Sequence, residues 1–137
     1  MTTTPNQNVA IVERFVAAEN EHDIDQIAQL VHPRVAFYGN GRLVADSWEG
    51  YRPVMAATFA AFPDSRRELL MVAAEDDRVA FRWRVEGTHS APYGGAPASG
   101  NHVTFNGTSW IKVAEGKIVE AWFDMDLAGP LRQMTEK

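Results

Sequence analysis

The stretch Lys117-Ile118-Val119-Glu120-Ala121-Trp122-Phe123-Asp124-Met125-Asp126 is the last of four strand-like runs in this chain. Successive side chains of a β-strand point to opposite faces of the sheet. One face would then be apolar and consist of Val119, Ala121, Phe123 and Met125. The other would carry Trp122, Asp124 and Asp126. An aspartate beside an indole in such apolar surroundings is a candidate acid/base residue.

Three further runs upstream have the same alternating character, over residues 67–74, 79–89 and 103–113. Glu75-Asp-Asp77 and Glu115-Gly116 are typical of tight turns, and residues 91–100, rich in Gly and Pro, are typical of a loop. Strands joined in this way predict an antiparallel meander.

The first half of the chain has helical periodicity instead. Apolar residues recur at helical spacing over residues 9–16 and 24–31, Asp23 with Gln26 fits an N-cap, and His32-Pro33 fits a stop. A short strand is expected over residues 35–38, a turn at Asn40-Gly41, and a third helix from near Pro53 to Phe62. Three helices followed by a meander predict an α+β domain whose curved, mostly antiparallel sheet wraps around the helices as a cone with an apolar interior.

Composition limits the functions that this chain can have. Its 137 residues contain no cysteine, which excludes disulfides, thiol nucleophiles and thiolate metal sites. The net charge is −5 and the basic residues are scattered, so a nucleic-acid-binding patch is not expected. The start lacks the features of a signal peptide, and no apolar run approaches membrane-spanning length. We expect one cytoplasmic domain over residues 1–137, with no membrane or nucleic-acid partner.

Several short motifs occur in an order that resembles the SnoaL-like polyketide (ester) cyclase family of the NTF2-like superfamily, over residues 9–134. They are residues 18–23 (Ala-Glu-Asn-Glu-His-Asp), Phe62-Pro-Asp64, residues 77–82, Gly87-Thr-His89, Ala98-Ser-Gly100, residues 116–120, and Trp122 followed by Asp126. The loop over residues 90–100 departs from the family pattern, so the resemblance says least about the shape of the substrate.

The resemblance implies a cone-shaped NTF2-like barrel with a deep apolar pocket, and a homodimer or homotetramer. It also implies ring closure of a polyketide-like substrate by intramolecular aldol condensation, with neither a metal nor an organic cofactor. The family's catalytic aspartate corresponds to Asp126, and its Gly-Thr-His histidine to His89. Asp124 corresponds to no family role.

The residues themselves favour the same kind of chemistry. An aldol reaction needs a Schiff-base lysine, a metal that polarises the carbonyl, or a substrate acidic enough for a general base. The three lysines lie at an outward strand position (Lys112), at a turn (Lys117) and at the C-terminus (Lys137). The four histidines have no metal-binding spacing. General-base catalysis by a carboxylate remains, and burial in an apolar pocket would raise the pKa of such a carboxyl group.

Both candidate catalytic residues also have a structural interpretation. Asp126 precedes a stretch where a short final helix could begin, so it could act as an N-cap. His89 continues the strand face of Phe81 and Trp83, where it could be a core residue, polarise a carbonyl or hold Asp126 through a hydrogen bond.

Aromatic and polar residues at element ends are candidates for binding the substrate. Trp122 is the first of these, because it should share a face with Asp126. The others are Phe37, Asn40, Trp48, Phe62 and Tyr93.

The sequence therefore predicts a cofactor-independent, polyketide cyclase-like enzyme that acts on an apolar, carbonyl-bearing small molecule. Isomerisation of a ketone and hydrolysis of an epoxide are alternatives that use the same fold and pocket carboxylates. A third alternative is a non-catalytic module that binds a small molecule or dimerises through the apolar face of residues 119–125.

Overall fold

The computed structural model describes residues 2–137, which form helices and strands in the order α, α, β, β, α, β, β, β, β, α. In chain order these are α1 (Pro5–Asn20), α2 (Ile24–Leu30), β1 (Val31–Gly39), β2 (Arg42–Ala45), α3 (Trp48–Ala61), β3 (Arg66–Glu75), β4 (Arg78–Thr88), β5 (His102–Ala114), β6 (Lys117–Met125) and α4 (Ala128–Thr135).

The first two helices begin at capping residues that the sequence supplies. The Thr4 hydroxyl accepts a hydrogen bond from the Gln7 N–H at 3.2 Å, and the Gln7 side chain accepts one from the Thr4 N–H at 2.8 Å. At α2, the Asp23 carboxylate accepts from the Gln26 N–H at 3.0 Å, which confirms the predicted N-cap. Caps of this kind stabilise a helix by about 1 kcal/mol each, because they satisfy backbone donors that have no partner within the helix.

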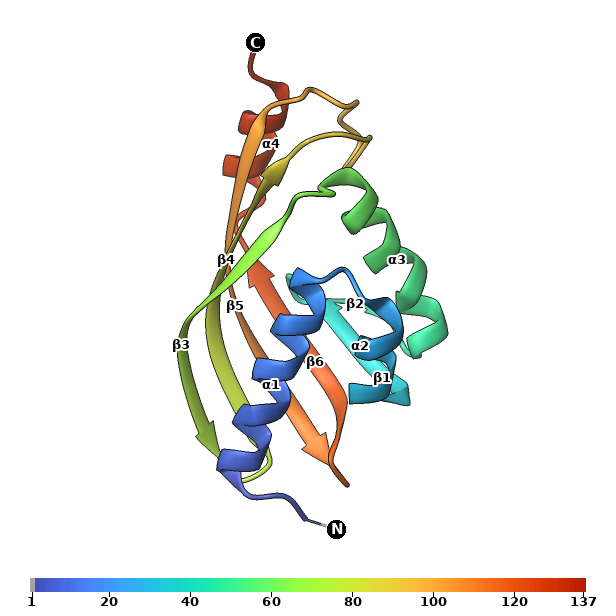
Figure 1. Cartoon of the computed structure of the whole chain (residues 1–137), viewed down its shortest axis with the longest axis vertical. Helices are drawn as coiled ribbons and strands as arrows, with labels where there is room; N and C mark the ends of the chain where they lie inside the picture. The colour runs from blue at the N-terminus through green and yellow to red at the C-terminus, as the bar shows by residue number, and fades with distance from the viewer. Residues whose placement is uncertain (1) are drawn as a thin grey trace.

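The six strands form one curved sheet in the order β2-β1-β6-β5-β4-β3. Neighbouring strands are antiparallel, except that β1 runs parallel to β6. The sheet bends around α1, α2 and α3, which lie on one side of it, and does not close into a complete barrel (Figure 1). The predicted α+β class and the meander of the last four strands are confirmed.

The two predicted hairpin turns connect β3 to β4 and β5 to β6. Each uses a residue in the left-handed region, with φ of 52° at Asp76 and 53° at Glu115. Gly116 follows Glu115 with φ of 77°, a conformation that glycine adopts without steric cost. These turns set the register that brings Trp110 of β5 opposite Trp122 of β6.

Three elements differ from the prediction. Strand β1 begins at Val31, directly after α2, rather than at residue 35. Helix α3 begins at Trp48 rather than near Pro53, because the Ser47 hydroxyl caps it by accepting a hydrogen bond from the Gly50 N–H at 3.1 Å. Pro53 therefore lies inside the helix. The short edge strand β2 was not predicted, because its four residues are mostly exposed and do not alternate between polar and apolar.

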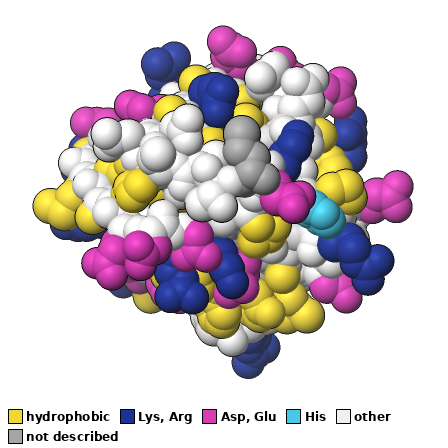
Figure 2. Space-filling model, turned by 90° about the horizontal axis from the view of Figure 1, so that it is seen from below, with side chains coloured by type: hydrophobic (Ala, Val, Ile, Leu, Met, Phe, Trp, Pro, Cys, Tyr) yellow, Lys and Arg dark blue, Asp and Glu magenta, His cyan; other side chains and the backbone are white. Residues whose placement is uncertain are grey.

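The core lies between the inner face of the sheet and the helices. Helix α1 packs on β3 and β4, whereas α2 and α3 pack on β1 and α4 packs on β5. Acidic and basic side chains are interspersed over the face shown in Figure 2. Within residues 2–137, no helix has the length and apolarity needed to cross a membrane.

Candidate active site

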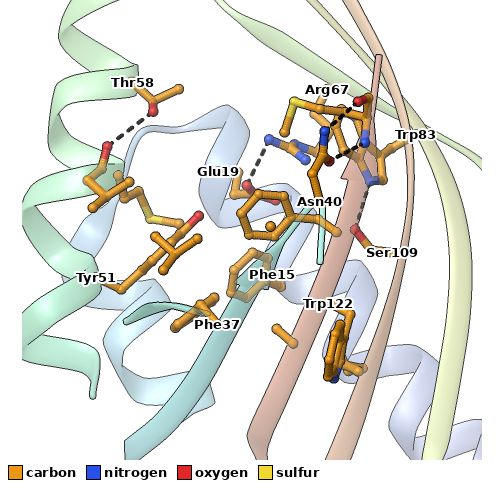
Figure 3. Close-up of a pocket in the computed structure, with 18 of the residues that line it drawn as sticks. Phe15, Glu19, Phe37, Asn40, Tyr51, Thr58, Arg67, Trp83, Ser109 and Trp122 are labelled. Carbon is orange, nitrogen blue, oxygen red and sulfur yellow. Dashed lines mark hydrogen bonds and ion pairs between the residues drawn. The ribbon is translucent and has the colours of Figure 1, made fainter. Parts of the chain in front are cut away.

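A cavity of about 340 Å³ lies between the inner face of the sheet and helices α1 and α3. Most of its wall is apolar or aromatic, including Val12, Phe15, Phe37, Met55, Phe81 and Ile111. A few polar side chains interrupt this wall, among them Glu19, Asn40, Tyr51, Arg67 and Ser109 (Figure 3). An enclosed apolar space with a few polar groups is the usual form of a small-molecule site.

The cavity face of β6 is its apolar face. Ala121, Phe123 and Met125 all line the cavity, as the alternation of the strand predicts for residues on one side. A register shift next to Val113 of β5 places Ile118, and not Val119, in the same wall. Because Ala121, Phe123 and Met125 line the cavity, they do not face outward for dimerisation, which was one form of the non-catalytic alternative.

Trp122 is among the residues that line the cavity, and it lies between strands β1 and β5. The ring stacks on Tyr38, with centroids 3.9 Å apart, and on Trp110, with centroids 5.4 Å apart. Its Nε1 donates a hydrogen bond to Glu120 at 2.6 Å. Of the two residues expected to share a cavity wall, Trp122 lines the cavity and Asp126 does not.

Asp126 follows β6 and lies one residue before Leu127, the N-cap residue of α4. Its carboxylate accepts hydrogen bonds from the N–H groups of Ala128 at 3.1 Å and Gly129 at 3.2 Å. The side chain is exposed, and it borders a shallow polar hollow that Asp124 and Arg82 also line. The expected burial of this carboxylate is therefore absent, and its contacts are those of the N-cap alternative.

Asn40 holds the end of β6 beside the cavity. Its Nδ2 donates to the Met125 carbonyl at 3.0 Å, and its Oδ1 accepts from the Met125 N–H at 2.9 Å. Met125 and Leu127 precede and follow Asp126, and both line the cavity. Asp126 thus lies at the cavity rim, and Asn40 uses its amide to position that rim.

His89 is fully buried and is not among the residues that line the cavity. Its Nδ1 lies 2.9 Å from the Ser99 hydroxyl, and its ring stacks on Phe62 with centroids 5.6 Å apart. Its Nε2 has no hydrogen-bond partner among the described residues. The hydrogen bond that the sequence suggested between His89 and Asp126 is therefore not formed.

The two motifs around residues 62–64 and 87–89 meet at one corner of the fold. The Asp64 carboxylate accepts hydrogen bonds from the Thr88 N–H at 2.7 Å and from the Thr88 hydroxyl at 2.6 Å. A Cβ at Gly87 would lie 3.1 Å from the Cβ of Phe62, so a side chain there would crowd this junction. These contacts give both motifs a structural role outside the cavity.

We expect the Asp64→Ala variant to be less stable than the wild type near neutral pH, by about 0.5–1 kcal/mol, because solvent screens this exposed carboxylate. The hydrogen bonds from the Thr88 side chain and backbone lower the pKa of Asp64 below its ordinary value of 3.8. This stabilisation is therefore fully present above pH 3.8 and is lost as the pH falls through the folded-state pKa. Urea unfolding at several pH values measures it, and a difference that grows toward low pH would contradict the assignment.

The remaining predicted binding residues divide into two groups. Phe37 and Tyr93 line the cavity, and Phe37 stacks on the ring of Tyr51 at 3.7 Å. Phe62 packs instead in an aromatic cluster with Tyr93 and His89. Trp48 lines a separate groove at the start of α3, and its Nε1 has no partner among the described residues.

A buried ion pair in the cavity wall was not predicted from the sequence. Glu19 is 8% exposed, and its Oε2 lies 3.0 Å from Nη2 of Arg67. Burial raises the pKa of the Glu19 carboxyl above its ordinary value of 4.5, and the positive charge of Arg67 opposes that rise. The Arg67 guanidinium also lies over the Trp83 ring, 4.8 Å from its centroid.

Two hydroxyl groups line the cavity with this pair. Burial is the main cause of a raised pKa at Tyr51, and the nearby negative charge of Glu19 adds to it, so the phenol stays protonated as a hydrogen-bond donor. The Ser109 hydroxyl accepts a hydrogen bond from Nε1 of Trp83 at 2.9 Å. The cavity therefore combines a carboxylate, a guanidinium and neutral donors within an apolar wall (Figure 3).

None of the three lysines is among the described residues that line the cavity. Across residues 2–137, no group of three or more His, Asp or Glu side chains is arranged to hold a metal ion. The groups that can transfer protons in this cavity are thus a carboxyl group and phenols.

The position of Glu19 in the sequence indicates that its side chain is buried. Val12, Phe15 and Val16 define the apolar stripe of the first helix, and Glu19 stands at the next position of that stripe, seven residues after Val12. A carboxylate in an apolar stripe is a candidate for a buried functional group. Its partner Arg67 could not be found in this way, because pairing across 48 residues depends on the tertiary fold.

The fold and the cavity together define an α+β protein with an apolar cavity between its sheet and its helices. A family model for SnoaL-like polyketide cyclase matches residues 9–134. The chain belongs to this family.

Solved structures of related proteins share the fold. AclR from Streptomyces galilaeus, a proposed hydroxylase, is 27% identical, with a TM-score of 0.87 over 96% of this chain and 82% of that one. IdmH from Streptomyces antibioticus, a proposed polyketide cyclase, is 25% identical, with a TM-score of 0.82 over 95% of this chain and 99% of that one. A proposed SnoaL-like polyketide cyclase from Jannaschia sp. CCS1 is 22% identical, with a TM-score of 0.89 over 100% of this chain and 99% of that one. Among curated proteins, no match is found. The predicted family and NTF2-like fold are confirmed.

Proposed function

We propose that this protein is a cyclase-like enzyme that closes a ring in an apolar, polyketide-like molecule by an intramolecular aldol-type reaction. The observation that carries the proposal is the apolar cavity with ionisable groups in its wall. Family membership supports a cyclase-like role, since the matching model is that of SnoaL-like polyketide cyclase.

The cavity suits this reaction for a physical reason. Ring closure moves a proton from carbon and develops negative charge on a carbonyl oxygen, so it needs a base and hydrogen-bond donors in a site that excludes water. Aromatic side chains such as Phe37, Phe81 and Phe123 would hold an apolar substrate. The polar groups of the wall would then face its carbonyl groups.

Within this proposal Asp126 acts as an acid/base at the cavity rim. Support comes from the family resemblance and from its position between two cavity-lining residues, Met125 and Leu127. To reach a substrate, its carboxylate would have to give up one of its hydrogen bonds to the start of α4.

Asp126→Asn tests this role directly. Asparagine caps a helix about as well as aspartate, so the variant should keep its stability while it loses the titratable group. We expect turnover of β-dicarbonyl substrates to fall about 10²–10⁴-fold, with nearly unchanged ligand affinity. Steady-state kinetics, affinity by Trp fluorescence and a melting temperature provide the three readouts.

Unchanged turnover in Asp126→Asn would leave this residue with the capping role alone. Product analysis across ketone and epoxide substrates separates ring closure from isomerisation and from epoxide hydrolysis. Binding of the whole panel without any product would favour a non-catalytic pocket.

A further inference from the structure

We propose that Glu19 removes the α-proton of the bound substrate inside the cavity, and that Arg67 and Tyr51 hold the enolate oxygen that forms. This inference rests on the proposed function and assigns its first chemical step. Asp126 keeps its proposed role at the rim, where it would relay the proton from Glu19 to the product later in the reaction.

The Glu19 carboxylate is held in place by the fold. It lies near the C-terminal end of α1, and its side chain is 9% exposed. The next residue, Asn20, fixes the partner strand, because its amide donates to the Arg67 carbonyl at 3.0 Å and accepts from the Arg67 N–H at 2.6 Å. Neighbouring residues of α1 thus position both the backbone and the guanidinium of Arg67. A base that is fixed in this way needs little reorganisation to react.

The charges in the cavity fit a proton transfer to Glu19. Before the transfer, the negative charge of Glu19 is balanced by Arg67. After it, Glu19 is neutral and the negative charge is on the substrate, where Arg67 can still balance it. The net charge of the apolar cavity does not change during the step, so no uncompensated charge is buried.

Donors for the new enolate oxygen are present beside the base. Arg67 Nε is buried and has no hydrogen-bond partner among the described residues. Tyr51 lines the same cavity with a protonated phenol, close enough for the charges of Glu19 and Arg67 to change its pKa. Figure 3 shows Glu19 between Tyr51 on α3 and Arg67 on β3.

The steps balance without a co-reactant. The α-C–H bond breaks, the proton bonds to a carboxylate oxygen of Glu19, and the electron pair forms the enolate. The enolate carbon then bonds to a second carbonyl carbon of the same molecule, and the electron pair of that C=O becomes an alkoxide. The proton on Glu19 is then passed to the alkoxide through Asp126 at the rim, which neutralises the alkoxide and restores both carboxylates.

Exchange of α-protons isolates the first step from ring closure. The probe is 2-tetralone in D₂O, an apolar ketone with exchangeable α-protons and no second carbonyl group, followed by ¹H NMR. We expect the wild type to accelerate exchange and Glu19→Gln to lose about 10²–10⁴-fold of this activity. Quenching of the protein's tryptophan fluorescence should show that the variant still binds the probe.

The matched control is Glu13→Gln, which makes the same change at an exposed position of α1. It should retain exchange. Exchange that persists in Glu19→Gln would overturn the inference. Failure of ring closure with exchange retained would count against the proposed function and leave the role of Glu19 intact.

A second variant distinguishes a catalytic role of Glu19 from a purely structural one. Glu19→Ala opens space beside Arg67, and added acetate should restore exchange because it supplies a carboxylate at the same place. No rescue in a folded Glu19→Ala protein would contradict the proposal.

The pH profile is a further readout. The charged or titratable groups that line the cavity with Glu19 are Arg67 on β3, Tyr51 on α3 and Tyr93 in the loop between β4 and β5. Wild-type exchange should fall as acid protonates Glu19, and Glu13→Gln should keep this acid limb. Residual exchange in Glu19→Gln with the same acid limb would assign the limb to another carboxylate.

Discussion

Replacing Arg67 with methionine is expected to lower the free energy of unfolding by about 3–5 kcal/mol, which is the usual cost of removing one partner of a buried ion pair. The Glu19 carboxylate would remain in the cavity wall without its counter-charge, and the packing of the guanidinium on Trp83 would also be lost. Urea unfolding at pH 8 measures the change.

The loss in Arg67→Met should depend on pH in a defined direction. Burial already raises the pKa of Glu19 above 4.5, and removing Arg67 takes away the one influence that lowers it. A group with a raised folded-state pKa contributes stability that is present below its ordinary pKa and is lost as the pH rises through the folded-state pKa. The deficit should therefore be smaller at pH 5 than at pH 8.

The control is the double variant Glu19→Gln with Arg67→Met, which contains neither charge. It should recover most of the lost stability, because an amide costs less to bury than an unpaired carboxylate. If Arg67→Met is as stable as the wild type at pH 8, the pair is not buried as described.

Ala121→Trp is expected to close the binding site. Ala121 lines the cavity and lies between Phe37 of β1 and Ile111 of β5, which also line it. An indole at this position would fill part of the 340 Å³ that a ligand needs. Affinity for an apolar ketone should fall at least about 100-fold, or about 2.8 kcal/mol, as measured by calorimetric titration.

Overpacking in Ala121→Trp should cost only about 1–3 kcal/mol of stability, since the new side chain enters an existing cavity. The matched control is Ala80→Trp, which adds the same side chain to the exposed, outer face of β4. That variant should bind normally. Equal affinities in Ala121→Trp and the wild type would place the ligand elsewhere.

The sequence predicted the fold well because local patterns determine most of it. The Asp23 cap, the turns at Asp76 and Glu115 and the alternation of β4 each depend on a few neighbouring residues, and all are present. The start of α3 and strand β2 were harder, since Ser47 gave a weak capping signal and β2 is a run of only four residues, most of them exposed.

The site was only partly predictable, for a different reason. Alternation sorted the side chains of β6 into two faces, but the curvature of the sheet decides which face is inside. The pair of Glu19 and Arg67 joins a helix end to a strand start, and no local pattern states which strand lies beneath a helix.

The most direct test of the proposed function is the conversion of 1-phenyl-1,3,5-hexanetrione, whose terminal methyl carbon can bond to the aryl ketone carbon, with ¹³C NMR detecting the new C–C bond. The wild type should form the six-membered ring faster than buffer alone, and Ala121→Trp should not exceed the buffer rate. Equal rates in wild type, Ala121→Trp and buffer, or equal acceleration by both proteins, would contradict ring closure in this cavity.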